Sequence, residues 1–367
     1  MDNLNNECFK KTPLYDEHVK RGGKIVEFGG YLLPVEYTSI TNEHMKVREE
    51  CGLFDVSHMG EVFVTGPDST MYLNYLLTSN MEKLKENRMQ YGMALYEDGN
   101  IVDDLMIYKF NNEKYLIVVN ASNTDKDYEW FVKNINNFNV KVENKSEEFG
   151  QLALQGPKAY DVLNKLSDFD FDSMKFYDFL TVKIDGKEFI CSRSGYTGGD
   201  GFEIYGKPED IVRLFDKFAS ENVTLCGLGC RDTLRFEGAL PLYGHEISDK
   251  INPLMACLSF ACDFSKDFIG KKSLLKYKEN PTHKLVGLEL IDKGIARNGY
   301  EVLNENEEVI GYITTGYLIP GHDKALALAM IKIEYSQLDT IVLVQVRKRL
   351  LKAIVRDRKF MEKIYKK

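Results

Sequence analysis

The chain has 367 residues, more than a single hydrophobic core usually serves, so two or three domains are expected. Hydrophobic residues make up 44% and charged residues 28%, which is typical of globular proteins, and a net charge of −8 argues against general binding to nucleic acid. No apolar stretch approaches the roughly 18 residues that cross a membrane, so no membrane-spanning segment is expected.

The cysteines and the first residues indicate the compartment. Residues 1–7 are polar and acidic, which is unlike a secretory signal, so a cytoplasmic location is expected. The seven cysteines are an odd number and include no Cys-x-x-Cys, and the six histidines are scattered. The pairs Cys226/Cys230 and Cys257/Cys262 do not have the spacing of a standard zinc site. Reduced, mostly buried thiols and no bound metal are therefore predicted.

The first segment with candidate chemistry is 52–61, in which Asp55, Ser57 and His58 lie within four residues. Such close neighbours do not readily adopt the geometry of a nucleophile, its base and an orienting group, and Gly-x-Ser-x-Gly is missing. The segment is therefore not a hydrolase triad. His58 is expected to form a structural hydrogen bond rather than to act as a base.

Two adjacent carboxylates, Asp103 and Asp104, follow a turn at 98–100 and begin an apolar run that predicts a strand. Like charges side by side repel, so the pair is unhelpful for stability. One interpretation is that both acids simply cap the strand in water. The other is that one of them holds an amine or a polar ligand.

Regular elements are predicted on both sides of residue 180. Segments 108–119 and 181–190 are typical of hairpins, the second with an Asp-Gly turn that accepts positive φ angles. Helical stripes follow Pro157 and Pro208; the second joins Ile211, Leu214, Phe215 and Phe218. Asn123 is a candidate cap for a helix that carries Trp130, Phe131 and Ile135.

Two segments, 64–68 and 154–158, share the pattern of a strand, a Gly-Pro turn and a helix. Because proline lacks an N–H group, it suits the first turn of a helix, where that group has no partner. The echo, about 90 residues apart, indicates either related modules or two independent common turns.

Segment 193–203 contains four glycines within seven residues, which predicts a tight loop close to a ligand or to another strand. It is not a phosphate loop, because Gly-Lys-Ser/Thr is missing. Tyr196 and Glu203 frame the loop. An aromatic face and a carboxylate suit a planar heterocycle with N–H donors, since the ring stacks and the carboxylate accepts.

Segment 227–237 places Arg231 and Arg235 one helical turn apart. A guanidinium fork pairs bidentately with a carboxylate, which is either that of a ligand or that of Asp232 or Glu237. From about residue 284 the helical stripes end and short strands predict a separate all-β domain. Its last stretch is basic, which indicates a solvated surface or a docking face for an acidic partner.

Taken together, these segments resemble the T-protein of the glycine cleavage system, a folate-dependent aminomethyltransferase. The motifs that carry the resemblance lie in family order over about residues 12–330, and the ordered series is more specific than any one of them. They are Thr12-Pro13-Leu14-Tyr15, Phe54-Asp55-Val56-Ser57-His58-Met59-Gly60, Val102-Asp103-Asp104-Leu105, Val119-Asn120-Ala121-Ser122-Asn123, Gln155-Gly156-Pro157, Gly195-Tyr196-Thr197-Gly198, Arg231-Asp232-Thr233-Leu234-Arg235, Leu242-Tyr243-Gly244 and Lys266-Asp267-Phe268-Ile269-Gly270-Lys271.

The resemblance implies an α+β fold of three domains in a cloverleaf around a central folate cavity, with mixed antiparallel sheets, helices and a C-terminal barrel-like domain. The expected domains are 1–52 with 145–235, then a ferredoxin-like domain of 53–144 with 236–280, and finally 284–367.

The resemblance also implies the reaction. The family moves the methylene of an aminomethyl group from a lipoylated carrier, the H-protein, to tetrahydrofolate and releases ammonia. The functional aspartate falls on Asp104, near the reactive folate nitrogen. Folate contacts fall on six further residues, with Tyr365 in a loosely matched region: Met59, Tyr91, Tyr196, Glu203, Arg231 and Tyr365. No metal, nucleic acid or membrane is expected.

The chain departs from the family pattern at Phe260, where the family usually has tryptophan, and in the third domain. There the family usually carries Thr-Ser-Gly-x-Phe-Ser-Pro-Thr-Leu, and this chain has Thr314-Thr315-Gly316-Tyr317-Leu318-Ile319-Pro320-Gly321-His322. Two alternatives are therefore weighed: a folate-dependent demethylase of a small N- or S-methyl compound, and a folate-binding relative without catalysis. Folate-binding relatives without catalysis carry a cysteine-containing Lys-Gly-Cys signature, and this chain does not have it, which counts against the second alternative.

Overall fold

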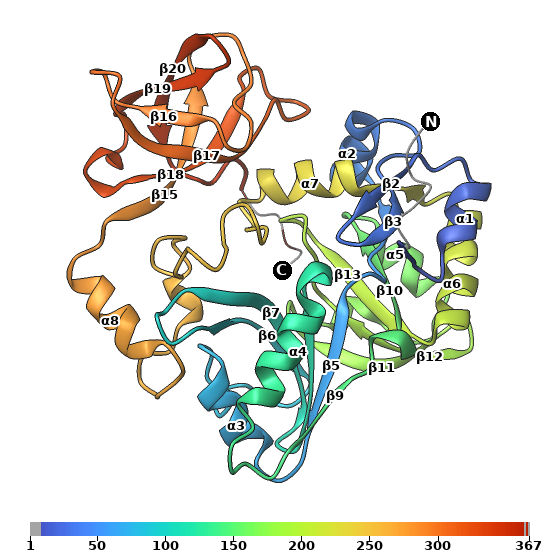
Figure 1. Ribbon diagram of the computed structural model, residues 1–367. Coiled ribbons are helices and arrows are strands. Elements are labelled where there is room, and N and C mark those ends of the chain that lie inside the picture. Colours follow the sequence, from blue (N-terminus) through green and yellow to red (C-terminus); the bar gives the residue numbers. More distant parts are fainter. Residues whose placement is uncertain (1–8, 363–364, 366–367) are drawn as a thin grey trace.

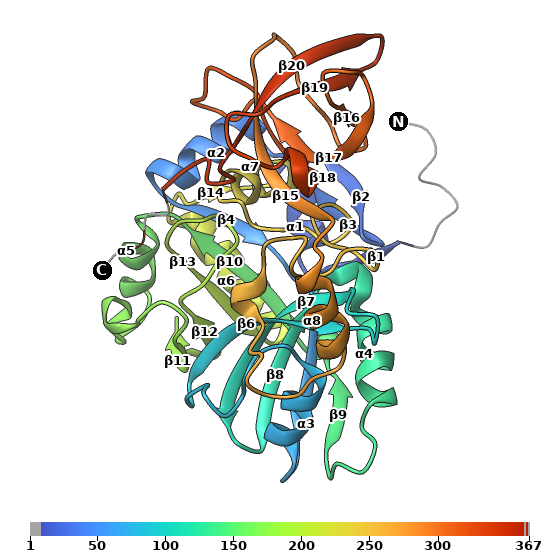
Figure 2. The same cartoon turned by 90° about the vertical axis from the view of Figure 1, so that its left-hand side faces the viewer.

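The computed structural model describes residues 9–362 and residue 365. Three lobes surround a central space, and the barrel lies at one end and a five-stranded sheet at the other (Figures 1 and 2). A small sheet near the N-terminus has the spatial order β1 (Lys10–Lys11), β3 (Tyr31–Pro34) and β2 (Ile25–Phe28). The helix α1 (Tyr15–Lys20) lies between β1 and β2 in the sequence.

A six-stranded sheet forms one lobe. In spatial order its strands are β11 (Phe179–Ile184), β12 (Lys187–Ser192), β13 (Gly201–Gly206), β10 (Gly150–Gln155), β4 (Gly52–Asp55) and β14 (Thr224–Leu225). Only β14 and β4 are parallel. The associated helices are α2 (Ile40–Glu49), α5 (Ala159–Asn164), α6 (Pro208–Ser220) and α7 (Leu228–Glu237). The stripe predicted on α6 is confirmed, since its four residues, Ile211, Leu214, Phe215 and Phe218, are all buried.

The second lobe is an antiparallel sheet of five strands. Their order is β6 (Arg88–Leu95), β7 (Ile101–Asn111), β8 (Lys114–Val119), β5 (Gly60–Thr65) and β9 (Lys141–Asn144), with helices α3 (Ser69–Leu76) and α4 (Thr124–Lys133). The hairpin predicted over 108–119 is the β7–β8 pair. Asn123 occupies the cap position of α4 but forms no capping hydrogen bond there, because its side chain bonds Asp103 instead; Ile135 lies beyond the helix.

The third lobe is a closed antiparallel barrel. Its strands, in order around the barrel, are β15 (His283–Leu290), β18 (Leu326–Lys332), β17 (Val309–Tyr317), β16 (Glu301–Leu303), β19 (Ile341–Val346) and β20 (Arg349–Arg356). The helix α8 (Lys271–Glu279) leads into it. The α+β fold with an all-β C-terminal barrel is thus confirmed. The exact domain limits stay a prediction, and β4 crosses the one expected between residues 52 and 53.

The Gly-Pro echo has the same geometry in both copies. Gly66 and Gly156 have φ angles of 127° and 128°, and each carbonyl accepts a hydrogen bond from the backbone three residues later. The prolines are not in the first helical turn as expected, because α3 begins at Ser69 and α5 at Ala159. Each proline instead occupies the second position of the preceding turn, where its fixed φ is suited.

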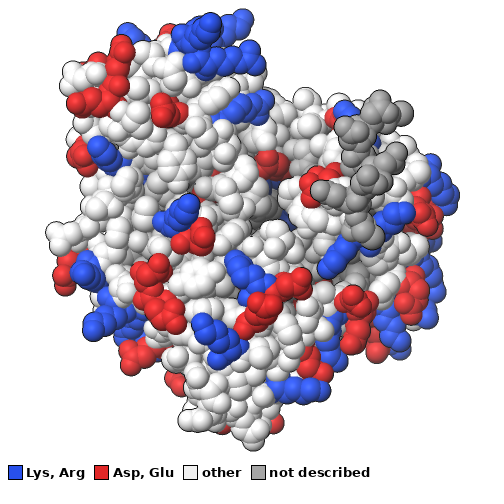
Figure 3. Space-filling view, in the orientation of Figure 1, with Lys and Arg blue, Asp and Glu red and all other residues white. Residues whose placement is uncertain are grey.

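The surface carries both signs of charge. On the face seen in Figure 3, acidic and basic side chains are interspersed, and basic side chains gather at the outer end of the barrel. Arg347, Lys348 and Arg349 are exposed around the turn between β19 and β20. The docking role of this basic stretch stays a prediction. In the part of the chain that the structure describes, no helix combines the length and the apolar character that a membrane crossing demands.

Candidate functional site

A cavity of about 430 Å³ lies where the two large sheets meet the segment that follows α7. Side chains from β6 and β7 line one part, side chains from β10 and β13 another, and residues 240–243 close a third. Six of the seven predicted site residues line it: Met59, Tyr91, Asp104, Tyr196, Glu203 and Arg231. The tertiary fold therefore joins positions that are up to 172 residues apart in the sequence.

Asp104 projects into this cavity from β7. Its carboxylate accepts hydrogen bonds from the Tyr91 hydroxyl at 3.0 Å and from the Asn120 side-chain amide at 2.7 Å. Burial, and next the negative charge of Asp103, raise the pKa of Asp104 to about 7. The group therefore changes its charge near neutral pH, as a residue that manages protons needs to do.

Asp103 points to the other face of the same strand, because successive side chains of a strand alternate. It is fully buried and accepts three N–H groups, two from Asn120 at 3.0 and 2.9 Å and one from Asn123 at 2.8 Å. The interpretation that both acids merely cap a strand in water is wrong. One acid lines the cavity, and the other is enclosed behind it.

A second carboxylate lies in the part of the cavity formed by β10 and β13. Glu203 accepts a hydrogen bond from the Ser194 hydroxyl at 2.6 Å and one from the Gln151 amide at 3.3 Å. Burial raises the pKa of Glu203, and a ligand with N–H groups would stabilise its charged form.

Two polar atoms at this part of the cavity lack a partner among the described residues. They are Oε1 of Gln151 and Nδ1 of His58, and both side chains are almost fully buried. Buried polar atoms are nearly always hydrogen-bonded, so these two fit a polar ligand. Burial lowers the pKa of His58 to about 4, which makes it neutral at physiological pH.

Arg231 and Tyr196 form a cationic and aromatic wall. The guanidinium lies 4.6 Å from the centre of the Tyr196 ring, and the Tyr196 hydroxyl donates to the carbonyl of Pro241. Within the described residues, the Arg231 side chain forms no hydrogen bond or ion pair, so its donors are free for a ligand.

The two arginines of α7 have different roles. Arg235, not Arg231, pairs with protein carboxylates, namely Asp232 at 2.7 Å and Glu246 at 2.5 Å. Glu237, the other partner considered, pairs with Arg48. Met59 lines the cavity at the edge of two apolar clusters. Tyr365 is not among the lining residues; its ring lies 4.4 Å from that of Phe176.

Two further lining residues deserve a place in the site, Gln151 and Asn120. Neither was singled out from the sequence as a candidate. For Gln151 a signal was present, since a long polar side chain interrupts the apolar strand 150–155 and is buried there. Asn120 looks like an ordinary loop residue in the sequence, and only the fold shows that it bridges Asp103 and Asp104.

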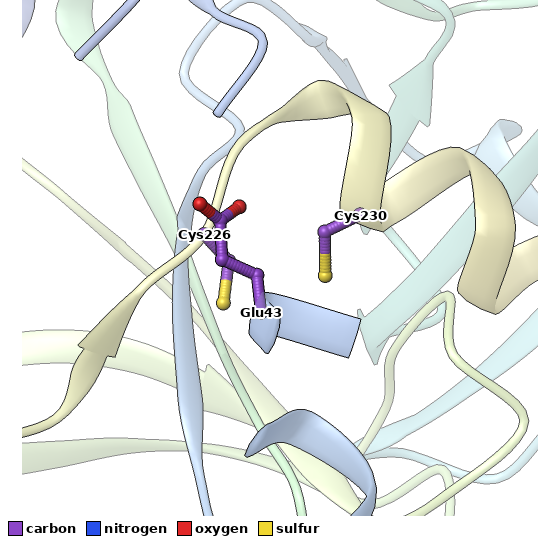
Figure 4. Close-up of side chains that lie close together, drawn as sticks. All are labelled: Glu43, Cys226 and Cys230. Carbon is purple, nitrogen blue, oxygen red and sulfur yellow. The ribbon is translucent and has the colours of Figure 1, made fainter. Parts of the chain in front are cut away.

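A separate buried cluster joins Glu43, Cys226 and Cys230, whose ligand atoms lie within 4.8 Å of one another (Figure 4). The Glu43 carboxylate already accepts three backbone N–H groups, two of them just before α2 and one from Gly227. Burial raises the pKa of Cys226, which keeps it a thiol. The six cysteines of the described residues are free, and Cys8 lies outside them. The cluster thus serves to hold the start of α7 in place.

Comparison with known proteins agrees with this geometry. Residues 14–266 match the model of the "GCVT N-terminal domain", and residues 283–362 match that of the "Glycine cleavage T-protein C-terminal barrel domain". An aminomethyltransferase of Caldanaerobacter subterraneus subsp. tengcongensis is 47% identical over 373 residues, covering 100% of this chain and 99% of the relative. One from Staphylococcus haemolyticus is 48% identical, covering 96% and 99%.

A solved structure gives the same result for the fold. The glycine cleavage system aminomethyltransferase T of Bartonella henselae superposes with a TM-score of 0.93 at 30% identity, covering 98% of this chain and 100% of that one. The chain therefore belongs to the glycine cleavage T-protein family and is an aminomethyltransferase.

Proposed function

We propose that this enzyme moves the methylene of an aminomethyl group, carried on the lipoyl arm of an H-protein, to tetrahydrofolate and releases ammonia. The cosubstrate is a reduced folate, the partner is the lipoylated carrier, and the compartment is the cytoplasm. The observation that supports this most directly is the Asp104 carboxyl group, which has a pKa of about 7 and lies in a cavity with a second carboxylate, Glu203.

The cavity suits a pterin. Glu203 accepts from ring N–H groups, and Arg231 donates to a ring carbonyl. Gln151 and His58 supply the two polar atoms that lack partners in the protein. Met59 and the ring of Tyr196 provide apolar and aromatic surface for the flat ring. We place the reactive amine of the folate beside Asp104.

The roles of the residues follow from the chemistry. Breaking the C–S bond to the lipoyl sulfur produces an iminium-like carbon, and the Asp104 carboxylate stabilises that positive charge. One folate amine then bonds to this carbon, and a second folate nitrogen bonds to it as the original C–N bond breaks and ammonia leaves. Of the two protons that the folate nitrogens lose, one goes to the departing ammonia and one to the lipoyl thiolate, and Asp104 manages this proton transfer. Tyr91 and Asn120 hold the carboxylate in place. No thiol of the chain is required, because the carbon passes directly between the two substrates.

The test is an ammonia-release assay with tetrahydrofolate, run with and without aminomethylated H-protein. We expect turnover only with the carrier. We expect Asp104→Asn to lose turnover by about a hundredfold or more, since removing one charge-stabilising group has an effect of this order, while tetrahydrofolate still binds. Unchanged turnover in Asp104→Asn would refute the mechanism.

The same assay decides the alternative. Activity on a small N- or S-methyl compound without any carrier would favour the demethylase. The departures from the family pattern at Phe260 and over residues 314–322 motivate that arm of the test. Phe260 has 77% of its surface exposed and its ring lies 6.1 Å from that of Tyr91, so it is placed where an incoming donor would meet the cavity.

A further inference from the structure

A third carboxyl group lies behind the site. Asp127 of α4 is fully buried, and neither of its oxygens accepts a hydrogen bond from an N–H or O–H group of the described residues. Its neighbour is Asp103: the Asn123 side chain at the start of α4 donates to Asp103, and Asp127 follows one helical turn later on the same face of α4. Two carboxyl groups this close are compatible only if a proton lies between them.

The donors around the pair indicate which group holds the proton. Asp103 accepts three N–H groups and is therefore the ionised partner. Asp127 accepts none, and an ionised carboxylate without donors is very costly in a buried position. Burial, and next the charge of Asp103, hold the pKa of Asp127 well above its ordinary value.

The other groups that face Asp127 do not change this assignment. The Nζ of Lys126 lies 3.6 Å from Asp127 Oδ1, beyond hydrogen-bonding distance, and donates to the Val102 carbonyl instead. The hydroxyls of Tyr96 and Tyr243 lie near enough to interact with a charge on Asp127. Burial raises the pKa of both tyrosines, so both stay neutral. Lys126 is thus at ion-pair distance from Asp127 and lowers its pKa, but burial and the charge of Asp103 raise that pKa by more.

The pair is connected to the reacting carboxylate through one side chain. The Asn120 amide donates to Asp103 at 2.9 Å and to Asp104 at 2.7 Å. We propose that Asp127 is a positioning residue for the transfer reaction: its protonated carboxyl group donates to Asp103, and the pair holds Asn120 in the orientation that supports Asp104. The role rests on the proposed function, whereas the shared proton does not.

Two variants of equal size separate the proton from packing. Asp127→Asn keeps a donor toward Asp103 and is expected to retain kcat within about twofold. Asp127→Leu removes the donor, so a fuller negative charge on Asp103 faces Asp104. We expect the acid limb of the pH profile of kcat to move to higher pH by about half to one unit, with the KM for tetrahydrofolate unchanged.

Difference infrared spectroscopy of the complete protein tests the proton without the reaction. We expect a band of a protonated carboxyl group at pH 7 that disappears in Asp127→Asn. Its absence from the native protein would overturn the proposal, as would an unchanged pH profile in a folded Asp127→Leu. If Asp127→Leu does not fold, the infrared band of the native protein and its loss in Asp127→Asn still test the proposal. A native protein that shows the band but releases no ammonia would refute only the proposed function.

Discussion

At the scale of single residues, the meaning of a side chain depends on the face to which it points. Asp103 and Asp104 are chemically identical neighbours, yet one is enclosed by N–H donors and the other lines the cavity. Strand alternation separates them, and burial, followed by the charge of Asp103, raises the pKa of Asp104 to about 7.

This pKa predicts the pH dependence of turnover. In the proposed mechanism the ionised Asp104 is the active form, so kcat should rise with pH through about 7. Tyr91→Phe removes a hydrogen bond that favours the ionised form, so the pKa should increase further and the acid limb should move upward by about one unit. Turnover measured from pH 6 to 9 checks this.

The matched control is Tyr75→Phe, on α3, because Tyr75 does not line the cavity. Its profile should coincide with that of the native enzyme. A Tyr91→Phe profile that also coincides would show that the hydroxyl does not support Asp104.

At the scale of elements, the two Gly-Pro turns set the start of α3 and of α5. At Gly156 the φ angle is 128°, and an added Cβ would lie 2.5 Å from the Glu50 carbonyl oxygen. That oxygen belongs to the backbone at the end of α2 and has little freedom to move. The turn therefore ties α2 to α5 as closely as two backbones allow.

We expect Gly156→Ala to destabilise the protein by about 2–4 kcal/mol, because the strained backbone and the clash add. Gly186→Ala is the control. Gly186 has a φ of 76°, but nothing lies within 4 Å of its added Cβ, so only about 1 kcal/mol of backbone strain is expected. Equal losses in urea denaturation would contradict the role of close approach.

At the scale of the whole molecule, a buried ion pair between Arg235 and Glu246, both outside the barrel, contacts the barrel through threonine hydroxyls of β17 (Val309–Tyr317). Arg235 of α7 is fully buried and donates to Glu246 at 2.5 Å and to the Thr315 hydroxyl of β17 at 3.0 Å. Glu246 also accepts the hydroxyl of Thr314 at 2.6 Å. Figure 1 shows α7 running between α2 and the barrel. The departure at Thr315, where the family usually has serine, thus falls on a contact between lobes.

Arg235→Met should destabilise the protein by about 3–5 kcal/mol, since it leaves the buried Glu246 without its cation. Arg213→Met provides the comparison: Arg213 pairs with Asp185 at the surface, and losing an exposed pair costs about 1 kcal/mol at most. Free energies of unfolding in urea measure both. Similar small losses would show that the network does not hold the lobes together.

Much of the local structure was predictable, because it depends on neighbours in the chain. The two hairpins, the buried face of α6 and the all-β character after residue 284 follow from alternation, helical spacing and turn residues. The capping of α4 by Asn123 was predicted wrongly, because Asp103, 20 residues away, attracts the same amide.

The sequence by itself determined the element types, the family and six residues that prove to line one cavity, because the ordered motifs are local patterns that can be read without coordinates. Only the tertiary structure decided which acid faces the cavity, that Gln151 and Asn120 also line it, and that Arg235 rather than Arg231 pairs with the protein's own carboxylates. These outcomes depend on burial and on contacts between distant segments. Such contacts change pKa values and hydrogen-bond partners, and no local pattern encodes them.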